Sequence, residues 1–132
     1  MLIIEIAKYL DAQGIGKYSE VDDTGTIFID GLPAYPNDVI SLYHRGGAGS
    51  DAKLGYGNQN IQIIVRAVFK VSALTQAQQI YDALHGFHMG QFVAGGVHIV
   101  GCQGIQSGVN YLNTDDKNRH EYSLNFEVEY KK

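Results

Sequence analysis

Apolar and polar side chains alternate along residues 61–71, and this pattern predicts a β-strand. The odd-numbered positions carry the apolar residues Ile61, Ile63, Val65, Ala67, Phe69 and Val71. Polar side chains stand between them at Gln62, Arg66 and Lys70. A period of two residues is typical of a strand that buries one face, so we expect residues 61–71 to form the core strand of a sheet.

A helix is predicted to follow this strand directly, over residues 72–86. Its apolar positions recur every three or four residues, at Leu74, Ala77, Tyr81 and Leu84. Ser72 and Thr75 are rival N-caps, and Thr75 with Gln78 has the spacing of a capping box. Gly86 suits the end of the helix, because glycine adopts the left-handed conformation that terminates helices. Strand and helix can cover each other's apolar faces, so we expect them to form the core together.

The end of the chain carries the clearest strand pattern. Apolar and aromatic residues share one side with a histidine: His120, Tyr122, Leu124, Phe126, Val128 and Tyr130. The other side is polar: Arg119, Glu121, Ser123, Asn125, Glu127 and Glu129. Such a strand is long against the usual length of about 5 or 6 residues. One wholly polar face predicts an antiparallel strand that exposes this polar face to solvent.

The remaining pattern predicts a helix over Leu2–Gln13 that Gly14 ends, and several short strands. These strands are expected at Thr26–Ile29, Val39–Tyr43 and Val97–Ile105, the last with a bulge or bend at its glycines. Residues 107–118 are expected to form a polar turn region. The chain has no internal repeat and no linker, so we expect one domain over residues 1–132. The predicted fold class is α+β, with an antiparallel sheet of four or more strands packed with two helices.

A long glycine-rich connection is predicted between two antiparallel strands, over residues 45–60. Loops of more than about 12 residues are uncommon unless they have a function. The glycines do not make a phosphate-binding loop, because Lys53 is followed by Leu54 and Gly55 rather than by a hydroxyl residue that opens a helix. A flexible connection is the better interpretation of this segment.

Composition excludes several classes of protein. With 45% hydrophobic and 18% charged residues, the chain of 132 residues has the composition of a globular protein. A formal charge of −4 argues against a protein that binds nucleic acid by neutralising phosphates. No apolar run approaches the roughly 20 residues of a membrane span, and the first residues do not match a signal peptide. The single cysteine agrees with a reducing compartment, so we expect a cytosolic product.

Candidate chemistry rests on a few scattered side chains. His85, His88 and His98 could hold a metal, and Cys102 could be a nucleophile with a histidine. Surface histidines and a small buried apolar cysteine are the simpler interpretation. Asp22–Asp23 and Asp115–Asp116 match no calcium loop and are expected to be solvated turn carboxylates. We therefore expect no catalytic residue, metal or cofactor, although a small enzyme or ligand-binding domain that uses these histidines or the cysteine stays an alternative.

The order of these pieces resembles the tail-terminator or minor capsid proteins of long-tailed bacteriophages. The resemblance covers nearly the whole chain. It begins with the N-terminal helix and continues through four stretches, a second helix and the C-terminal strand. The stretches are Ile27-Phe28-Ile29-Asp30-Gly31-Leu32-Pro33, Pro36-Asn37-Asp38-Val39-Ile40, Tyr43-His44-Arg45-Gly46-Gly47 and Ile63-Ile64-Val65-Arg66. The helix carries Ala77, Ile80-Tyr81 and Leu84-His85-Gly86. The most telling piece is the C-terminal strand that an arginine opens, Asn118-Arg119-His120-Glu121-Tyr122-Ser123-Leu124-Asn125-Phe126-Glu127-Val128.

This resemblance implies a structural virion protein that is not an enzyme and takes no cofactor. Such proteins form a ring, typically of six copies, that caps the tail tube, halts its polymerisation and offers a docking face for the head. The implied partners are further copies of the chain, the tail tube protein and head-tail connector proteins, with double-stranded DNA passing through without specific binding and no membrane. The implied place is the head-proximal end of the virion tail, assembled in the host cytoplasm. A head-completion or head-tail adaptor protein is the neighbouring alternative.

The resemblance also assigns a role to the glycine-rich loop, as the arm that touches the tube or a neighbouring subunit. The assembly residues implied there are Arg45, Gly46, Gly47, Gly49, Ser50, Asp51, Lys53, Gly55, Tyr56 and Gly57. The segment up to Ile40 is acidic, because it has seven carboxylates and only two lysines, Lys8 and Lys17. This negative charge could keep DNA from binding as it passes.

Overall fold

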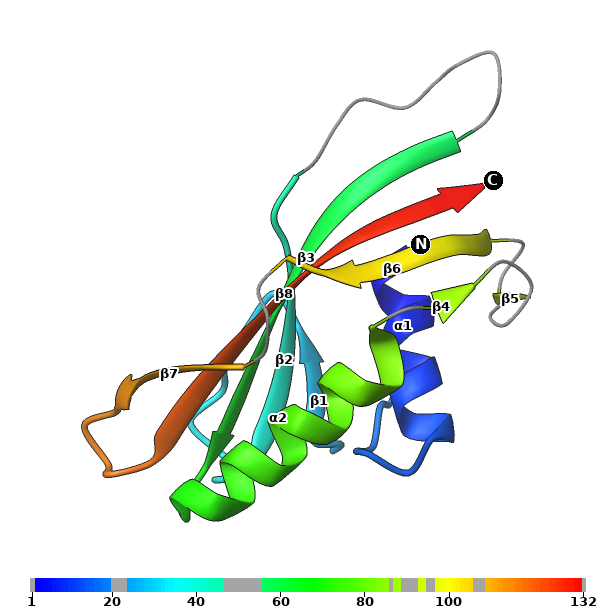
Figure 1. The fold of residues 1–132 in the computed structure, drawn as a ribbon. Helices are drawn as coiled ribbons and strands as arrows, with labels where there is room; N and C mark the ends of the chain where they lie inside the picture. The colour runs from blue at the N-terminus through cyan, green and yellow to red at the C-terminus, as the bar shows by residue number, and fades with distance from the viewer. Residues whose placement is uncertain are drawn as a thin grey trace.

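A computed structural model gives the fold of the chain and describes residues 2–19, 24–46, 56–85, 87–88, 93–94, 97–105 and 109–131. In this part of the chain two helices lie on one face of a mostly antiparallel sheet (Figure 1). The predicted α+β class is therefore confirmed.

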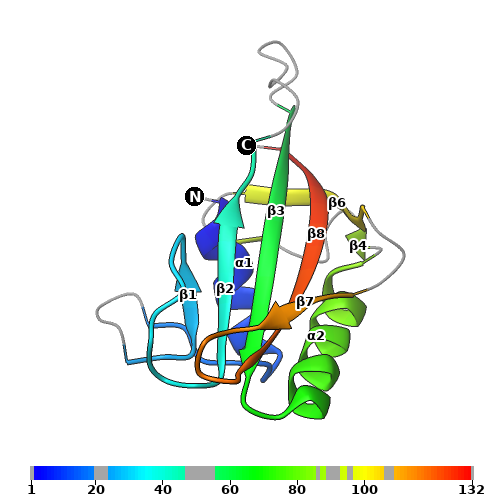
Figure 2. The same cartoon turned by 90° about the vertical axis from the view of Figure 1, so that its left-hand side faces the viewer.

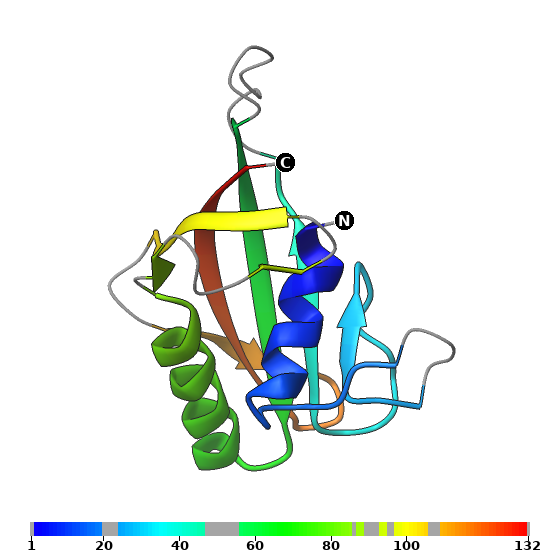
Figure 3. The same cartoon turned by 90° about the vertical axis from the view of Figure 1, so that its right-hand side faces the viewer.

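The helices are α1 (Leu2–Ala12) and α2 (Lys70–Leu84), which lie side by side across the sheet (Figure 3). Helix α1 buries an apolar stripe that includes Ile3, Ile6 and Leu10, as its sequence predicts. As expected, Gly14 stops the helix shortly after its last residue, Ala12. The φ of Gly14 is +76°, a left-handed conformation that glycine adopts without steric cost. The Ile15 amide then donates to the Leu10 carbonyl over 3.1 Å and closes the turn.

The strands pair in the order β1-β2-β3-β8-β6-β4, with β5 paired to β6 and β7 paired to β8. Their bounds are β1 (Ile27–Ile29), β2 (Val39–His44), β3 (Tyr56–Ala67), β4 (Phe87–His88), β5 (Val93–Ala94), β6 (Val97–Gly104), β7 (Asn110–Thr114) and β8 (His120–Lys131). Strands β1 and β2 are parallel, and the other named strand pairs are antiparallel.

The longest ladder joins β3 to β8, from Tyr56 opposite Lys131 to Ala67 opposite His120. The other edge of β8 is shared between two strands: β7 pairs with its first residues and β6 with its last. The register of β6 shifts between Ile99 and Gly101, which is the irregularity that the glycines of this strand predict. Strand β8 thus holds both parts of the sheet together (Figure 2).

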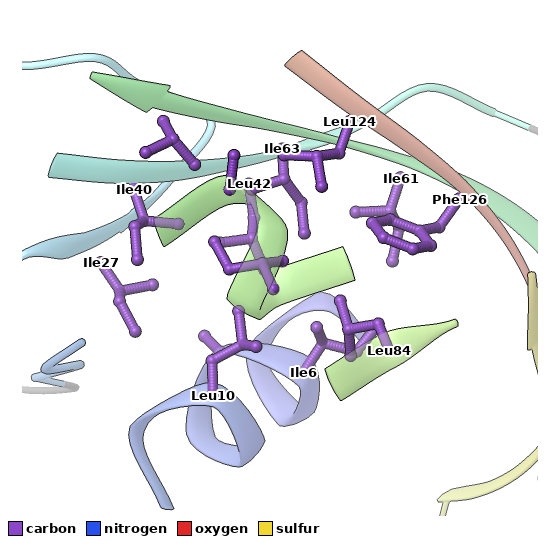
Figure 4. Close-up of a cluster of buried hydrophobic side chains, with 14 of the residues drawn as sticks. Ile6, Leu10, Ile27, Ile40, Leu42, Ile61, Ile63, Leu84, Leu124 and Phe126 are labelled. Atoms are coloured by element: carbon purple, nitrogen blue, oxygen red, sulfur yellow. The ribbon is translucent and has the colours of Figure 1, made fainter. Parts of the chain in front are cut away.

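The core lies between the sheet and the helices, and Figure 4 shows its side chains. The alternation predicted for β3 and β8 is confirmed, because Ile61, Ile63, Leu124 and Phe126 are each at most 1% exposed. Helix α1 contributes Leu10 to the same cluster.

The boundary between β3 and α2 differs from the prediction. The strand ends at Ala67 and the helix begins at Lys70, so Phe69 and Val71 do not continue the buried face and are 73% and 74% exposed. Phe69 is the N-cap, in an extended conformation with no side-chain capping bond, so the predicted caps at Ser72 and Thr75 are wrong.

The early start of α2 also changes its buried stripe, which consists of Ala73, Ala77, Ile80 and Leu84. Leu74 was predicted in this stripe but is 41% exposed, because it lies one helical step of about 100° away from Ala73. Tyr81 is partly buried against the core. The inner face of α2 is therefore built from small residues, and some of its larger apolar side chains face outward.

Two further segments contain more structure than their sequences indicate. Strand β7 lies inside the predicted turn region 107–118, and β4 and β5 lie within residues 87–96, which were predicted only as a bridge. The polar face of β8 is wet at Glu127 and Glu129, but Ser123 is 4% exposed and Arg119, just before the strand, is 5% exposed. The prediction of a fully wet face is thus wrong at the start of the strand, because another segment covers it.

Candidate assembly surface

The glycine-rich loop is described only where it leaves and rejoins the sheet. Arg45 and Gly46 follow β2, and Tyr56 and Gly57 open β3. The other predicted assembly residues lie outside the described residues: Gly47, Gly49, Ser50, Asp51, Lys53 and Gly55.

The start of this loop is fixed to the sheet by contacts of Arg45 and Gly46. The Arg45 amide donates to the Asn60 carbonyl over 2.9 Å, and the Asn60 amide donates to the Gly46 carbonyl. The Arg45 guanidinium donates to Gln62 Oε1 over 2.8 Å and lies 4.7 Å from the centre of the Tyr43 ring. The loop therefore leaves from a defined point at one end of the β3–β8 ladder.

The outer face of the ladder is polar at this end. Here the outer face means the side of the sheet that faces away from the helices (Figure 2). Asn58 lies opposite Glu129, and Asn60 lies opposite Glu127. Both carboxylates are exposed and both amides are half-buried. This end presents amides and negative charge to its surroundings.

The other end of the ladder is covered by residues 31–38, which we call the clamped segment. Arg66 is 2% exposed, and its guanidinium donates to the Pro36 carbonyl over 2.8 Å and to the Asn37 carbonyl over 3.1 Å. Arg119 donates through Nη1 to the Ala34 carbonyl over 2.5 Å. Two buried arginines thus hold the main chain of a segment whose own side chains point outward, with Tyr35 70% exposed.

A carboxylate orients one of these arginines. Asp115 Oδ2 accepts from Arg119 Nε over 2.8 Å, and Asp115 Oδ1 accepts from the Arg119 and Lys117 amides over 2.8 and 3.0 Å. Desolvation acts to raise the pKa of Asp115, but these hydrogen bonds outweigh it and hold that pKa below its ordinary value. The turn between β7 and β8 is therefore an ordered part of the clamp.

The buried arginines also affect each other and a neighbouring glutamate. Burial, followed by the charge of Arg119, lowers the pKa of Arg66. Glu121 lies opposite Arg66 in the ladder, and burial followed by the charge of Asp115 raises its pKa against the opposing effect of the two arginines. Sequence reasoning missed these contacts, because Arg66 and Arg119 occupy ordinary polar positions of alternating strands. The extended run 32–36, with prolines at 33 and 36, was the one signal of a covering segment.

Exposed apolar side chains gather where α2 begins. Phe69 and Val71 are more than 70% exposed, and Val68 and Leu74 are about 40% exposed. On the opposite flank of the domain a hollow of about 460 Å³ lies beside β1. Its lining includes Tyr18, Phe28, Leu32, Pro33 and Tyr35.

The side chains considered for chemistry do not form a reactive group in the described structure. His85 Nδ1 accepts from the Gly104 amide over 3.0 Å, and the His85 ring stacks on Tyr81, so this histidine joins α2 to β6. Burial raises the pKa of the Cys102 thiol to about 12, which keeps it protonated and unreactive. The side chains of His88 and His98, like Asp22 and Asp23, lie outside the described residues.

Within the described ranges, no group of three or more histidine, cysteine or carboxylate side chains is placed to hold a metal ion. Nor is any helix in those ranges both long and apolar enough to cross a membrane.

Known proteins share the family and the fold of this chain. No curated protein sequence matches the chain. Among solved structures, a chain from the "Virion of native gene transfer agent (GTA) particle" superposes with a TM-score of 0.61 at 18% sequence identity, covering 81% of this chain and 79% of that chain. That similarity shows a shared fold. The sequence profile described as "Bacteriophage tail terminator protein" matches residues 9–132, and the chain therefore belongs to this family of phage tail structural proteins, as its sequence predicts.

Proposed function

We propose that the protein forms a hexameric ring that caps the tail tube at its head-proximal end, stops tube polymerisation and provides the face to which the head docks. The observation that carries this proposal is the family match over residues 9–132. The proposal treats residues 1–132 as one domain that acts without catalysis or cofactor. Its partners are other copies of the chain, the tail tube and head-tail connector proteins.

The glycine-rich loop is the proposed contact with the tube or a neighbouring copy. Two observations support this role: Arg45 fixes the start of the loop to Asn60 and Gln62, and the loop leaves from the end of a ladder that spans the whole of β3. A rigid base allows a glycine-rich segment to adapt to a partner while its point of departure stays fixed. The full set proposed for this contact is Arg45, Gly46, Gly47, Gly49, Ser50, Asp51, Lys53, Gly55, Tyr56 and Gly57.

DNA is proposed to pass through the ring without specific binding. The net charge of −4 opposes contact with phosphates, and the exposed Glu127 and Glu129 add negative charge to the outer face of the sheet. Each such contact would have to overcome repulsion rather than release counterions.

The test is to add purified protein to tail tubes and to examine the tube ends by electron microscopy. Wild-type protein is expected to appear as a ring at one end and to stop further growth of the tube. Deletion of Gly49 to Gly55 is expected to abolish capping while the melting temperature stays nearly unchanged. Asp116→Asn, in the turn after β7, is the matched control and should cap normally.

Three results would contradict parts of the proposal. Tubes that keep growing and stay bare at saturating wild-type protein would remove the capping function. Density for this chain at the head completion or adaptor position of a virion, rather than on the tube, would assign it to a different part of the head-tail joint. If the loop deletion unfolds the protein, the loop is structural and the proposed contact is wrong.

A further inference from the structure

We infer that neighbouring copies meet head to tail, with the outward face of α2 in one copy seated against the hollow beside β1 in the next. This inference rests on the proposed ring and names the two surfaces that would build it. The occupant of each surface is a second copy of the chain.

The outward face of α2 is unusual for a surface helix because it has almost no charge. The fifteen residues of the helix include one lysine, Lys70, and one carboxylate, Asp82. Between them the exposed positions carry aliphatic, hydroxyl and amide side chains: Val71, Ser72, Leu74, Thr75, Gln78 and Gln79. A solvent-facing helix side usually carries charged residues, whereas the centre of a protein interface is depleted of them.

Apolar side chains continue this face beyond the start of the helix. Phe69 is 73% exposed and Val71 is 74% exposed, and Val68 and Leu74 add to them. The inner face of α2 uses the small residues Ala73 and Ala77, while the larger Val71 and Leu74 lie outside. Contiguous apolar side chains on a surface commonly mark a binding site.

The hollow beside β1 has a lining that suits contact with this helix face. Among the described residues that line it there is no acid, lysine, arginine or histidine, and Phe28, Leu32 and Pro33 make much of this lining apolar. Its rim residue Tyr35 belongs to the clamped segment, whose carbonyls are held by Arg66 and Arg119. The hollow is therefore preformed, and a partner does not need to order it on binding.

The two surfaces lie on opposite flanks of the domain, with α2 beyond β8 and the hollow at the β1 border (Figures 2 and 3). Two different patches on opposite flanks produce a head-to-tail contact, which closes into a ring when the rotation per copy allows it. Each copy carries a net charge of −4, so contact between copies is favoured where both surfaces lack charge. The nearly uncharged helix face and the described lining of the hollow suit each other in this sense, because like charges brought together oppose association. The Lys117 ammonium, 4.6 Å from the centre of the Tyr35 ring, adds a positive charge at the rim, which a copy of net charge −4 does not repel.

The size of the helix face indicates how strong the contact is. A helix of fifteen residues is about 22 Å long, and a strip about 10 Å wide along it covers a few hundred Å², below the roughly 800 Å² per partner of a stable interface. Copies are therefore expected to associate weakly in isolation and to be held together when a tube aligns them.

Cysteine cross-linking tests this contact even when it is weak. The double variant Thr75→Cys with Leu32→Cys places one thiol on the helix face and one at the hollow, while the buried Cys102 serves as the unreactive background. With a short bismaleimide at high protein concentration, the double variant should give a ladder of dimers, trimers and larger species. A mixture of the two single variants should give dimers only, and each single variant alone should stay monomeric.

Two control variants show whether the cross-links are specific. The pair Thr75→Cys with Glu127→Cys, whose second thiol lies on the outer face of the sheet, should cross-link at least tenfold less. Adding Val71→Asp to the productive pair should reduce its cross-linking by a similar factor without lowering the melting temperature, because Val71 is already exposed.

The outcomes separate this inference from the proposed function. Efficient dimers from Thr75→Cys alone would indicate a symmetric helix contact and overturn the inference. A cross-linking yield of Thr75→Cys with Leu32→Cys that is no higher than the yield of the control pair would also overturn it. If rings form on tubes while the productive pair still fails to cross-link on them, the contact is wrong and the ring function stands. If no ring forms on tubes, the proposed function itself fails.

Discussion

The two ends of the β3–β8 ladder share the same strands and the same core, but they differ on the outer face. At the end from which the glycine-rich loop departs, Glu127 and Glu129 stand exposed. At the other end Arg66 and Arg119 are buried beneath the clamped segment and hold its carbonyls. One end is thus open to its surroundings, and the other is closed by a segment of the same chain.

This difference shows how one ladder supports two tasks. The core-facing residues Val128, toward the open end, and Val65, toward the closed end, are both fully buried, so the core extends toward both ends. The open end leaves the outer face uncovered where the loop departs, while the closed end fixes the border of the hollow beside β1. The following substitutions probe each end separately.

The largest effect is expected from Phe126→Ala, which tests whether the core reaches from the middle of the ladder into its open half. Phe126 is 1% exposed and packs near Tyr81 of α2, so its removal should cost about 3–5 kcal/mol of unfolding free energy through lost burial and a cavity. Chemical denaturation monitored by circular dichroism measures this value. A loss below about 1 kcal/mol would mean that the core does not extend to this end.

A smaller effect is expected from Arg66→Met at the closed end. The substitution keeps the aliphatic volume but leaves the Pro36 and Asn37 carbonyls without their donor, which should cost about 1–3 kcal/mol. Faster hydrogen exchange at the amides of residues 34 and 35 should accompany this loss. Unchanged stability and exchange would show that the segment holds its place without the arginine.

Glu121→Gln tests the closed end through the pH dependence of the unfolding free energy. The pKa of Glu121 is raised in the folded chain, so the folded state favours its protonated form, and ionisation of Glu121 costs stability as pH rises above its ordinary value of 4.5. The variant should therefore gain stability relative to wild type as pH rises from 4.5 through the folded pKa of Glu121.

Asp115→Asn should show the opposite trend. The pKa of Asp115 is lowered by folding, so its contribution is present at neutral pH and is lost as pH falls through the folded value. The variant should be less stable than wild type at neutral pH and approach it in acid. Parallel pH profiles of the two variants, measured by denaturant titration, would contradict both assignments.

The smallest effect is expected at exposed positions. Leu74→Ala on α2 and Glu127→Gln at the open end should each change the unfolding free energy by less than about 0.5 kcal/mol. Thermal melts of both variants check this expectation. A cost of about 2 kcal/mol or more for Leu74→Ala, which is typical of emptying a core site, would place Leu74 in the core and remove the free helix face.

Much of the fold follows from local sequence pattern. The two-residue period of β8 and the stripe of α1 each specify a face to bury, and Gly14 specifies an end. The start of α2 could not be found in this way, because Phe69 caps the helix through its backbone alone and leaves no side-chain signal. The stripe of Ala73 and Ala77 is also weak in sequence, since alanine suits an exposed helix position equally well.

The surface was harder to predict than the core. Strand β7 has no alternation that would distinguish Asn110–Thr114 from a polar turn, and it is a strand because β8 offers it an open edge. The burial of Arg66 and Arg119 depends on a segment about 30 residues away in one case and 85 in the other, as the hydrogen bonds of Arg66 to Pro36 and of Arg119 to Ala34 record. Such contacts are properties of the fold and leave no local pattern.

The pairing of β3 with β8 has a consequence for how the protein is made. The paired residues lie between 53 and 75 positions apart in the sequence, and α2 and the strands from β4 to β7 come between them. Closing so long a stretch of chain costs entropy before any pair contributes, which slows folding. During synthesis β3 must wait for β8 with one edge uncovered, so the newly made chain passes through a stage in which it can pair wrongly with its neighbours.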